Sequence, residues 1–184
     1  KYYPKFLPWI SKKPYYSIIC DHFYIVEGLR TCFKCHKPTH VIGFGIEDYY
    51  PIEPDEDNPG KHRIDSSLDE DCIQIVAHID PLPAPVEKFI KSNWNYKLDF
   101  AQQSNSFYLA NHCEHCNVIQ GDHYLFEDAA LPFSVYDEED AAKLTLYKIP
   151  LEYDLVVDYL ELGFSSTDYL IKEYGKIVDS GITL

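Results

Sequence analysis

Short runs of alternating apolar and polar residues recur along the chain, and four of them flank two Cys-x-x-Cys pairs. These four runs are rich in β-branched and aromatic residues, a composition typical of β-strands. They cover residues 23–31, 39–47, 106–111 and 118–127. The first two runs surround one cysteine pair and the last two surround the other. Each pair is therefore predicted to lie at the tip of a β-hairpin.

The stretch between the two hairpins predicts further elements. Residues 85–92 predict a helix, because proline stands at the start and the apolar residues share one face. Alternation predicts a strand at residues 72–79. Residues 47–60 are acidic and broken by prolines, so a loop is predicted there.

The pattern of the C-terminal part predicts helices and one more strand. Residues 137–149 begin with acidic side chains, which favour the first turn of a helix, and end as a strand. Helical patterns follow at residues 151–162 and 165–177. In the second of these we expect Ser or Thr to cap the first turn and Gly175 to loosen the last.

A chain of 184 residues can bury one core, and no linker separates independent domains. We therefore expect a single α+β domain over residues 1–184, built of antiparallel hairpins with helices packed on the sheet. Its cysteine tips are residues 32–35 and 113–116, with a structured insertion at about 47–104.

Two Cys-x-x-Cys tips can supply four thiolates to one metal ion. Cys32, Cys35, Cys113 and Cys116 predict one tetrahedral Zn²⁺ site, like that of a zinc ribbon but split between two hairpins. The 77 residues between Cys35 and Cys113 exceed the roughly 15–20 of compact zinc ribbons, hence the predicted insertion. Because four thiolates fill the coordination shell, the zinc is predicted to be structural and not catalytic.

The residue after each cysteine pair supports this interpretation. A tight knuckle turns through a left-handed conformation there, which His and Asn tolerate better than most residues. These positions hold His36 and Asn117. The left-handed backbone conformation expected at this position therefore accounts for His36 in the Cys-x-x-Cys-His motif.

Other uses of the cysteines remain open on the sequence alone. The Cys-x-x-Cys-His motif is also that of covalent haem attachment, with His40 as a possible further ligand, but the second pair would then be unexplained. A redox dithiol would need a strand-to-helix junction, and two unrelated thiol pairs are the third alternative. His112 and His115 could replace a thiolate, although solvent-facing or supporting roles fit their position better. Cys20 and Cys72 are expected to be buried free thiols.

The segments VEGLRTCFKCHKPTHVIGFGI and FYLANHCEHCNVIQGDHYLF resemble small, largely uncharacterised bacterial proteins with two separated zinc knuckles. The likeness covers residues 22–46 and 104–127 and, more loosely, the helix between them. It implies metal binding by the four cysteines. Some compact acidic proteins of this kind are similar to immunity proteins encoded beside secreted toxins.

Charge favours a protein partner over nucleic acid. Residues 1–45 carry seven basic and two acidic residues, and the rest carries nine basic and 28 acidic, giving +5 and −19. We expect a non-enzymatic binding protein, such as an immunity protein that masks a basic, nucleic-acid-targeting toxin with acid and tyrosine. The candidate contact residues are Tyr49, Tyr50, Asp55, Glu56, Asp57, Asp69, Glu70, Asp71, Tyr136, Asp137, Glu138, Glu139 and Asp140.

Two alternatives stand beside that expectation. The first is a zinc-ribbon nucleic-acid-binding or regulatory protein that uses the basic start of the chain and the first knuckle. Its candidate residues are Lys5, Lys12, Lys13, Lys34, Lys37, Trp9, Tyr15, Tyr16 and Phe33. The second is a hydrolase with an unrecognised site, for which only the pairs Asp21/His22, His78/Asp80 and Asp122/His123 offer acid–base groups.

No signal-peptide core and no apolar run of about 18 residues interrupts the sequence, so a cytoplasmic protein without a membrane partner is expected. Because the chain contains no Met, even at position 1, we expect the initiator to precede residue 1.

Overall fold

The structure is a computed structural model that describes residues 18–47, 49–59, 62–64, 71–80, 82–101, 105–127, 131–152, 155 and 165–182. The elements in chain order are β1 (Ile18–Ile19), β2 (His22–Thr31), β3 (Pro38–Ile46), β4 (Tyr50–Pro54), β5 (His62–Ile64), β6 (Gln74–Val76), α1 (Ala84–Asn93), β7 (Tyr96–Ala101), β8 (Ser106–His112), β9 (Ile119–Gln120), the π-helical turn η2 (His123–Glu127), α2 (Glu138–Ala142), β10 (Thr145–Pro150), α3 (Asp168–Tyr174) and β11 (Lys176–Asp179).

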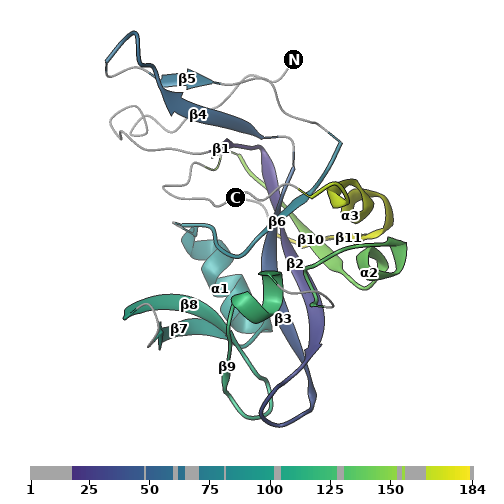
Figure 1. The fold of residues 1–184 in the computed structure, drawn as a ribbon. Coiled ribbons are helices and arrows are strands. Elements are labelled where there is room, and N and C mark those ends of the chain that lie inside the picture. Colours follow the sequence, from purple (N-terminus) through teal and green to yellow (C-terminus); the bar gives the residue numbers. More distant parts are fainter. Residues whose placement is uncertain are drawn as a thin grey trace.

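A five-stranded sheet in the order β11–β10–β2–β3–β6 forms the centre of the molecule (Figure 1). Its neighbouring strands are antiparallel except β11, which runs parallel to β10. Two smaller antiparallel sheets are β1–β4–β5 and β7–β8–β9. The predicted mixed α+β class and both predicted hairpins are confirmed.

Both faces of the central sheet are covered. Along β2, Phe23 and Ile25 pack into one apolar cluster with α1, and Tyr24 and Val26 pack into another with α3. A strand buried on both faces has no polar side, which explains the unbroken run FYIV. On β3, a Cβ at Gly43 would lie 2.9 Å from the Phe126 ring, so glycine lets η2 pack directly on this strand.

The insertion between the hairpins contributes to all three sheets, with β4 and β5 in the sheet that contains β1. It supplies β6 to the central sheet and β7 to the sheet of the second hairpin. The loop predicted at residues 47–60 is wrong in part, because β4 lies within it. β4 pairs with β1 on one side and β5 on the other, and the local pattern could not show partners from elsewhere in the chain.

The remaining predicted elements that fall on described residues are confirmed, with bounds that differ from the predicted ones. α1, α2, β6 and β10 lie where the patterns placed them. The helix at 165–177 ends at Tyr174, and β11 follows because Gly175 adopts an extended conformation. Thr167 does not cap that helix, since its hydroxyl donates to the carbonyl of Val135 at 2.7 Å. The helix predicted at 151–162 lies mostly outside the described residues.

No helix in the described part of the chain has the length and apolar content needed to cross a membrane.

Candidate metal centre

The two cysteine knuckles have the same backbone geometry. In the first, the N–H of Cys32 donates to the carbonyl of Lys37 and the N–H of His36 donates to the carbonyl of Cys32, both at 2.9 Å. The second repeats both bonds at 2.9 Å, with Cys113 in place of Cys32 and Asn117 in place of His36. His36 and Asn117 have φ angles of 58° and 60°, which confirms the predicted left-handed turns.

The four sulfur atoms converge between the two tips. The Sγ atoms of Cys32 and Cys116 lie 3.7 Å apart, those of Cys35 and Cys113 lie 3.6 Å apart, and all four lie within 4.8 Å of one another. A tetrahedron with metal–sulfur bonds of about 2.3 Å has sulfur atoms about 3.8 Å apart. The four cysteines are therefore close enough together to hold one metal ion.

The surroundings of two of the sulfurs, those of Cys32 and Cys113, favour the thiolate form that a metal needs. Burial raises the pKa of the Cys32 thiol, but hydrogen bonds from the backbone N–H groups of Cys35 and Lys34 and from neighbouring thiols lower it to about 6. The pKa of Cys113 is lowered by equivalent bonds against the effect of burial. The backbone N–H of Val118 lowers the pKa of Cys116, but burial and the neighbouring thiols raise it to about 11. Thiolates are the metal-binding form of cysteine.

Gln120 supports the centre from the second hairpin. Its side chain is fully buried, and its Nε2 lies 3.5 Å from the Sγ of Cys32 and 3.1 Å from the carbonyl oxygen of Val118. Its Oε1 is buried without a hydrogen-bond partner among the described residues. An amide held in this position orients one ligand sulfur, as groups behind metal ligands commonly do.

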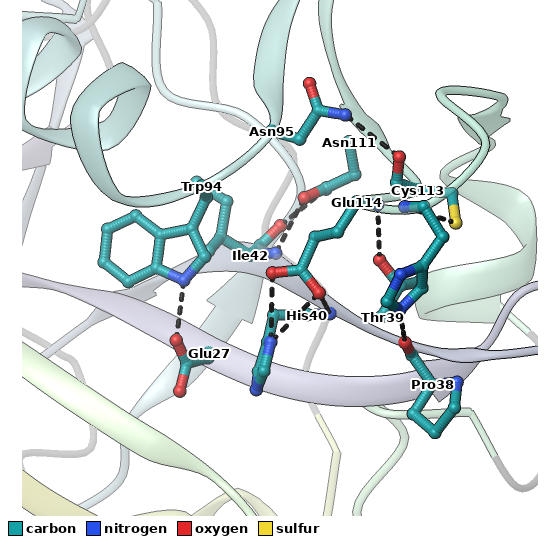
Figure 2. Close-up of polar contacts among 11 residues, drawn as sticks. Glu27, Pro38, Thr39, His40, Ile42, Trp94, Asn95, Asn111, Cys113 and Glu114 are labelled. Carbon is teal, nitrogen blue, oxygen red and sulfur yellow. Dashed lines mark hydrogen bonds and ion pairs between the residues drawn. The ribbon is translucent and has the colours of Figure 1, made fainter.

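Side chains from the second hairpin form hydrogen bonds with the backbone of the first (Figure 2). The amide of Asn111 accepts from the N–H of Ile42 and donates to the carbonyl of Ile42, both at 2.8 Å. Glu114 accepts the N–H of His40 at 3.2 Å, and its own N–H donates to Thr39 Oγ1 at 3.0 Å. Polar contacts thus hold the separated halves of the site together beside the sulfurs.

The histidines near the second knuckle are engaged away from the sulfurs. His112 is buried. Its Nδ1 lies 2.9 Å from the carbonyl oxygen of Ala110, and its Nε2 lies 2.9 Å from the carboxylate of Asp99. His115 places Nε2 2.9 Å from the carbonyl of Pro38, across the gap between the hairpins. Both therefore have supporting roles. Cys20 and Cys72 lie outside the cluster, Cys20 buried and Cys72 half-buried instead of buried as predicted.

Among the described residues, the acid–base pairs seen in the sequence form two groups of contacts, one around His22 and one in which His78 of one pair meets Asp122 of another. His22 lies 2.6 Å from Asp21 and 3.1 Å from Glu47, whose other oxygen lies 2.8 Å from Lys172 of α3. His78 lies 2.8 Å from Asp122.

Glu47 is the centre of the larger of these groups. Burial raises the pKa of its carboxyl, but hydrogen bonds from His22, Lys172 and Tyr24 outweigh burial and lower it to about 2. For His22, burial lowers the pKa, yet the bonds to Glu47 and Asp21 raise it overall. Glu47 is thus a buried anion that ties the end of β3 to α3.

Two of the predicted contact residues, Tyr49 and Asp55, have structural roles. Tyr49 is 8% exposed, its hydroxyl donates to Gln74 at 3.0 Å, and burial raises its pKa to about 12, so its placement on a binding surface was wrong. Alternation after β3 turns this ring into the core. Asp55 accepts the N–H groups of Asp57 and Asn58 in the turn after β4.

The remaining acidic candidates among the described residues lie in three places. Glu56 and Asp57 are exposed in that same turn. The turn is the end of the β4–β5 hairpin that lies farther from α2 and α3 (Figure 1). Asp71 is exposed and lies 3.8 Å from Lys172 of α3. Tyr50 begins β4, and the positions of Asp69 and Glu70 lie outside the described residues.

The segment before and within α2 carries the rest. Asp137 caps this helix by accepting the N–H of Asp140 at 2.9 Å, and Asp140 pairs with Lys143 at 2.8 Å. Glu138 and Glu139 are exposed, and so is Tyr136 at 61%.

Three residues of α3 were missed in the sequence but lie beside this segment. α2 packs next to α3 (Figure 1), and Tyr169, Glu173 and Tyr174 are exposed on α3. Burial raises the pKa of Tyr174, and the carboxylates of Glu138 of α2 and Glu173 raise it further. The i, i+4 spacing of Tyr169 and Glu173 on a predicted helix was the available signal.

Comparisons with known proteins assign no family: no family model, no curated protein and no solved structure matches the chain.

Proposed function

We propose that the chain is a non-enzymatic protein-binding protein whose fold is held by one structural Zn²⁺ ion. Tetrahedral four-sulfur sites select Zn²⁺ or iron–sulfur chemistry, and the sulfur pairs at 3.7 and 3.6 Å across the knuckles suit one tetrahedral ion, for which we propose Zn²⁺. A site filled by four thiolates leaves no position for substrate, so the metal stabilises the fold.

The acidic, tyrosine-rich face of α2 and α3 supports the binding role. We call this the α2–α3 surface, made of Tyr136, Glu138, Glu139, Tyr169, Glu173 and Tyr174. Its three tyrosines are 61%, 51% and 37% exposed in chain order. Tyrosine supplies contact area at low entropic cost, and carboxylates around it attract a basic surface.

The proposed partner is a basic protein, such as a secreted toxin that acts on nucleic acid and that this chain neutralises as an immunity protein. A net charge of −14 speeds the encounter with such a partner. The test is binding to the protein encoded by the adjoining gene, measured by calorimetry, together with inhibition of that protein's activity.

Charge reversal locates the contact. The triple variant Glu138→Lys, Glu139→Lys, Glu173→Lys should weaken binding by about 100-fold, since like charges across an interface cost several kcal/mol. The matched variant Glu56→Lys, Asp57→Lys reverses charge at the β4–β5 turn and should bind within about threefold of wild type. Equal losses in the two variants would contradict the assignment of the surface.

One observation favours a second function. Phe33, Lys34 and Lys37 are exposed at the first knuckle, an aromatic and two cations suited to single-stranded nucleic acid. Titration with single-stranded and duplex DNA and RNA at about 50 and 200 mM salt separates the two functions. Tight binding that collapses with salt and with Lys34→Glu, Lys37→Glu would replace our proposal.

A further inference from the structure

A cavity of about 280 Å³ lies between β6, η2, the segment before α2 and the start of α3. Phe126 and Phe133 stack in its wall, with ring centroids 4.7 Å apart and planes 22° apart. Ile171 of α3 adds a buried apolar side chain. The volume is at the lower end for small-molecule pockets, so the cavity suits one side chain or a fragment of similar size.

One acidic group also lines this cavity. Asp168 accepts the N–H of Ser165 at 2.9 Å, and burial raises the pKa of its carboxyl against the effect of that bond. Lys172 follows one helical turn later, but its ammonium pairs with Glu47 at 2.8 Å. Asp168 therefore presents a partly desolvated carboxylate to an aromatic cavity. Lys172 does not neutralise this carboxylate, because its ammonium pairs with Glu47.

The cavity and the α2–α3 surface share one residue. Tyr136, 61% exposed, lines the cavity and is also the first residue of that surface. An aromatic face beside a carboxylate matches a guanidinium, which can stack on the ring while forming paired hydrogen bonds with the carboxylate. A lysine ammonium lacks the planar shape that both contacts use.

We infer that this cavity receives an arginine side chain of the basic partner, with its guanidinium on Asp168 and its aliphatic stem against Phe133 and Ile171. The inference rests on the proposed function, because the partner supplies the arginine. It identifies the part of the α2–α3 surface where an anchor residue is buried, the kind of contact that dominates binding energy.

The cavity is tested first with a small probe. Nα-acetyl-arginine amide is titrated into the ¹⁵N-labelled chain, with Nα-acetyl-citrulline amide as the uncharged isostere. Amide shifts should change at Ser165 and Asp168 with the arginine compound. Asp168→Asn, which keeps the shape and the bond from Ser165, should weaken binding about tenfold. Tyr136→Ala should weaken it about threefold, and the exposed control Glu56→Gln in the β4–β5 turn should not change it.

The same variants are then measured against the protein of the adjoining gene. Asp168→Asn should weaken that complex about tenfold as well. Equal binding of the citrulline compound, or unchanged binding by Asp168→Asn, would overturn the inference. A complex lost in the triple charge reversal but intact in Asp168→Asn overturns the arginine anchor and leaves the proposed function standing. If the wild-type chain does not bind that protein, the proposed function fails, whereas an Asp168-dependent arginine signal still supports the cation site.

Discussion

The two ends of the β2–β3 hairpin are fastened to distant parts of the chain by different chemistry. At the tip, Cys32 and Cys35 meet the cysteines of the second hairpin. At the base, Glu47 meets His22 of β2 and Lys172 of α3. The cysteine cluster and the Glu47 contacts are about 30 Å apart along the ten-residue strand β2.

The difference between these ends concerns what each contact demands of the local sequence. A four-cysteine metal site needs two ligands from each tight turn, so it imposes the Cys-x-x-Cys spacing and a left-handed residue after it. A buried ion pair needs only that opposite charges meet in space. The tip can therefore be recognised in the sequence, and the base cannot.

The largest expected effect is loss of the metal. Elemental analysis should find about one Zn²⁺ per chain, and Cys32→Ser or Cys116→Ser should lose the metal and lower Tm by more than about 10 °C. The control is Cys72→Ser, which alters a half-buried thiol outside the cluster and should keep its metal. A metal-free preparation that melts like the wild type would disprove the structural role.

The base of the hairpin should contribute less, and only within a range of pH. Because the pKa of Glu47 is lowered from 4.5 to about 2, its stabilisation is present above pH 4.5 and lost as pH falls toward 2. Because the pKa of His22 is raised, its share is present below pH 6.5 and lost as pH rises through its folded value.

Glu47→Gln should therefore lower the free energy of unfolding by about 3 kcal/mol near pH 5–6 and by much less near pH 2. Urea unfolding at a series of pH values measures the difference. Asp71→Asn removes a 98% exposed carboxylate near the same lysine and should cost under about 0.5 kcal/mol. Equal losses in both variants, or a loss independent of pH, would contradict this account of the base.

A smaller effect should separate metal affinity from folding at the tip. Gln120→Leu removes the amide beside Cys32 and should weaken metal binding about tenfold in competition with a chelator. Gln74→Leu removes a buried amide far along the sheet, bonded to Tyr49, and should destabilise the fold without altering metal affinity. Unchanged affinity in Gln120→Leu would show that this amide only fills space.

The smallest effect concerns the turn at His36. His36 has a φ angle of 58°, which glycine adopts easily and β-branched residues do not. His36→Gly should therefore keep the metal and change the free energy of unfolding by less than about 1 kcal/mol, whereas His36→Val should lower it by about 1–2 kcal/mol. Thermal melting and metal content of the two variants provide the measurement. Metal loss in His36→Gly would make this histidine a ligand, contrary to the structure.

The sequence by itself determined the features that local rules govern. Alternation and the cysteine spacing predicted both hairpins, the left-handed residues His36 and Asn117, and the four sulfurs that converge. Helix α1 followed from its proline start and apolar face. Each of these depends on residues a few positions apart.

Only the tertiary structure decided the features that join distant residues. β4 became a strand through partners on either side, Tyr49 turned into the core, and Glu47 met Lys172 from 125 positions away. The cavity formed because η2 and α3 pack near each other on the sheet. Charge pairs, edge pairing and cavities carry no fixed spacing along the chain, since their energy depends on proximity in space alone.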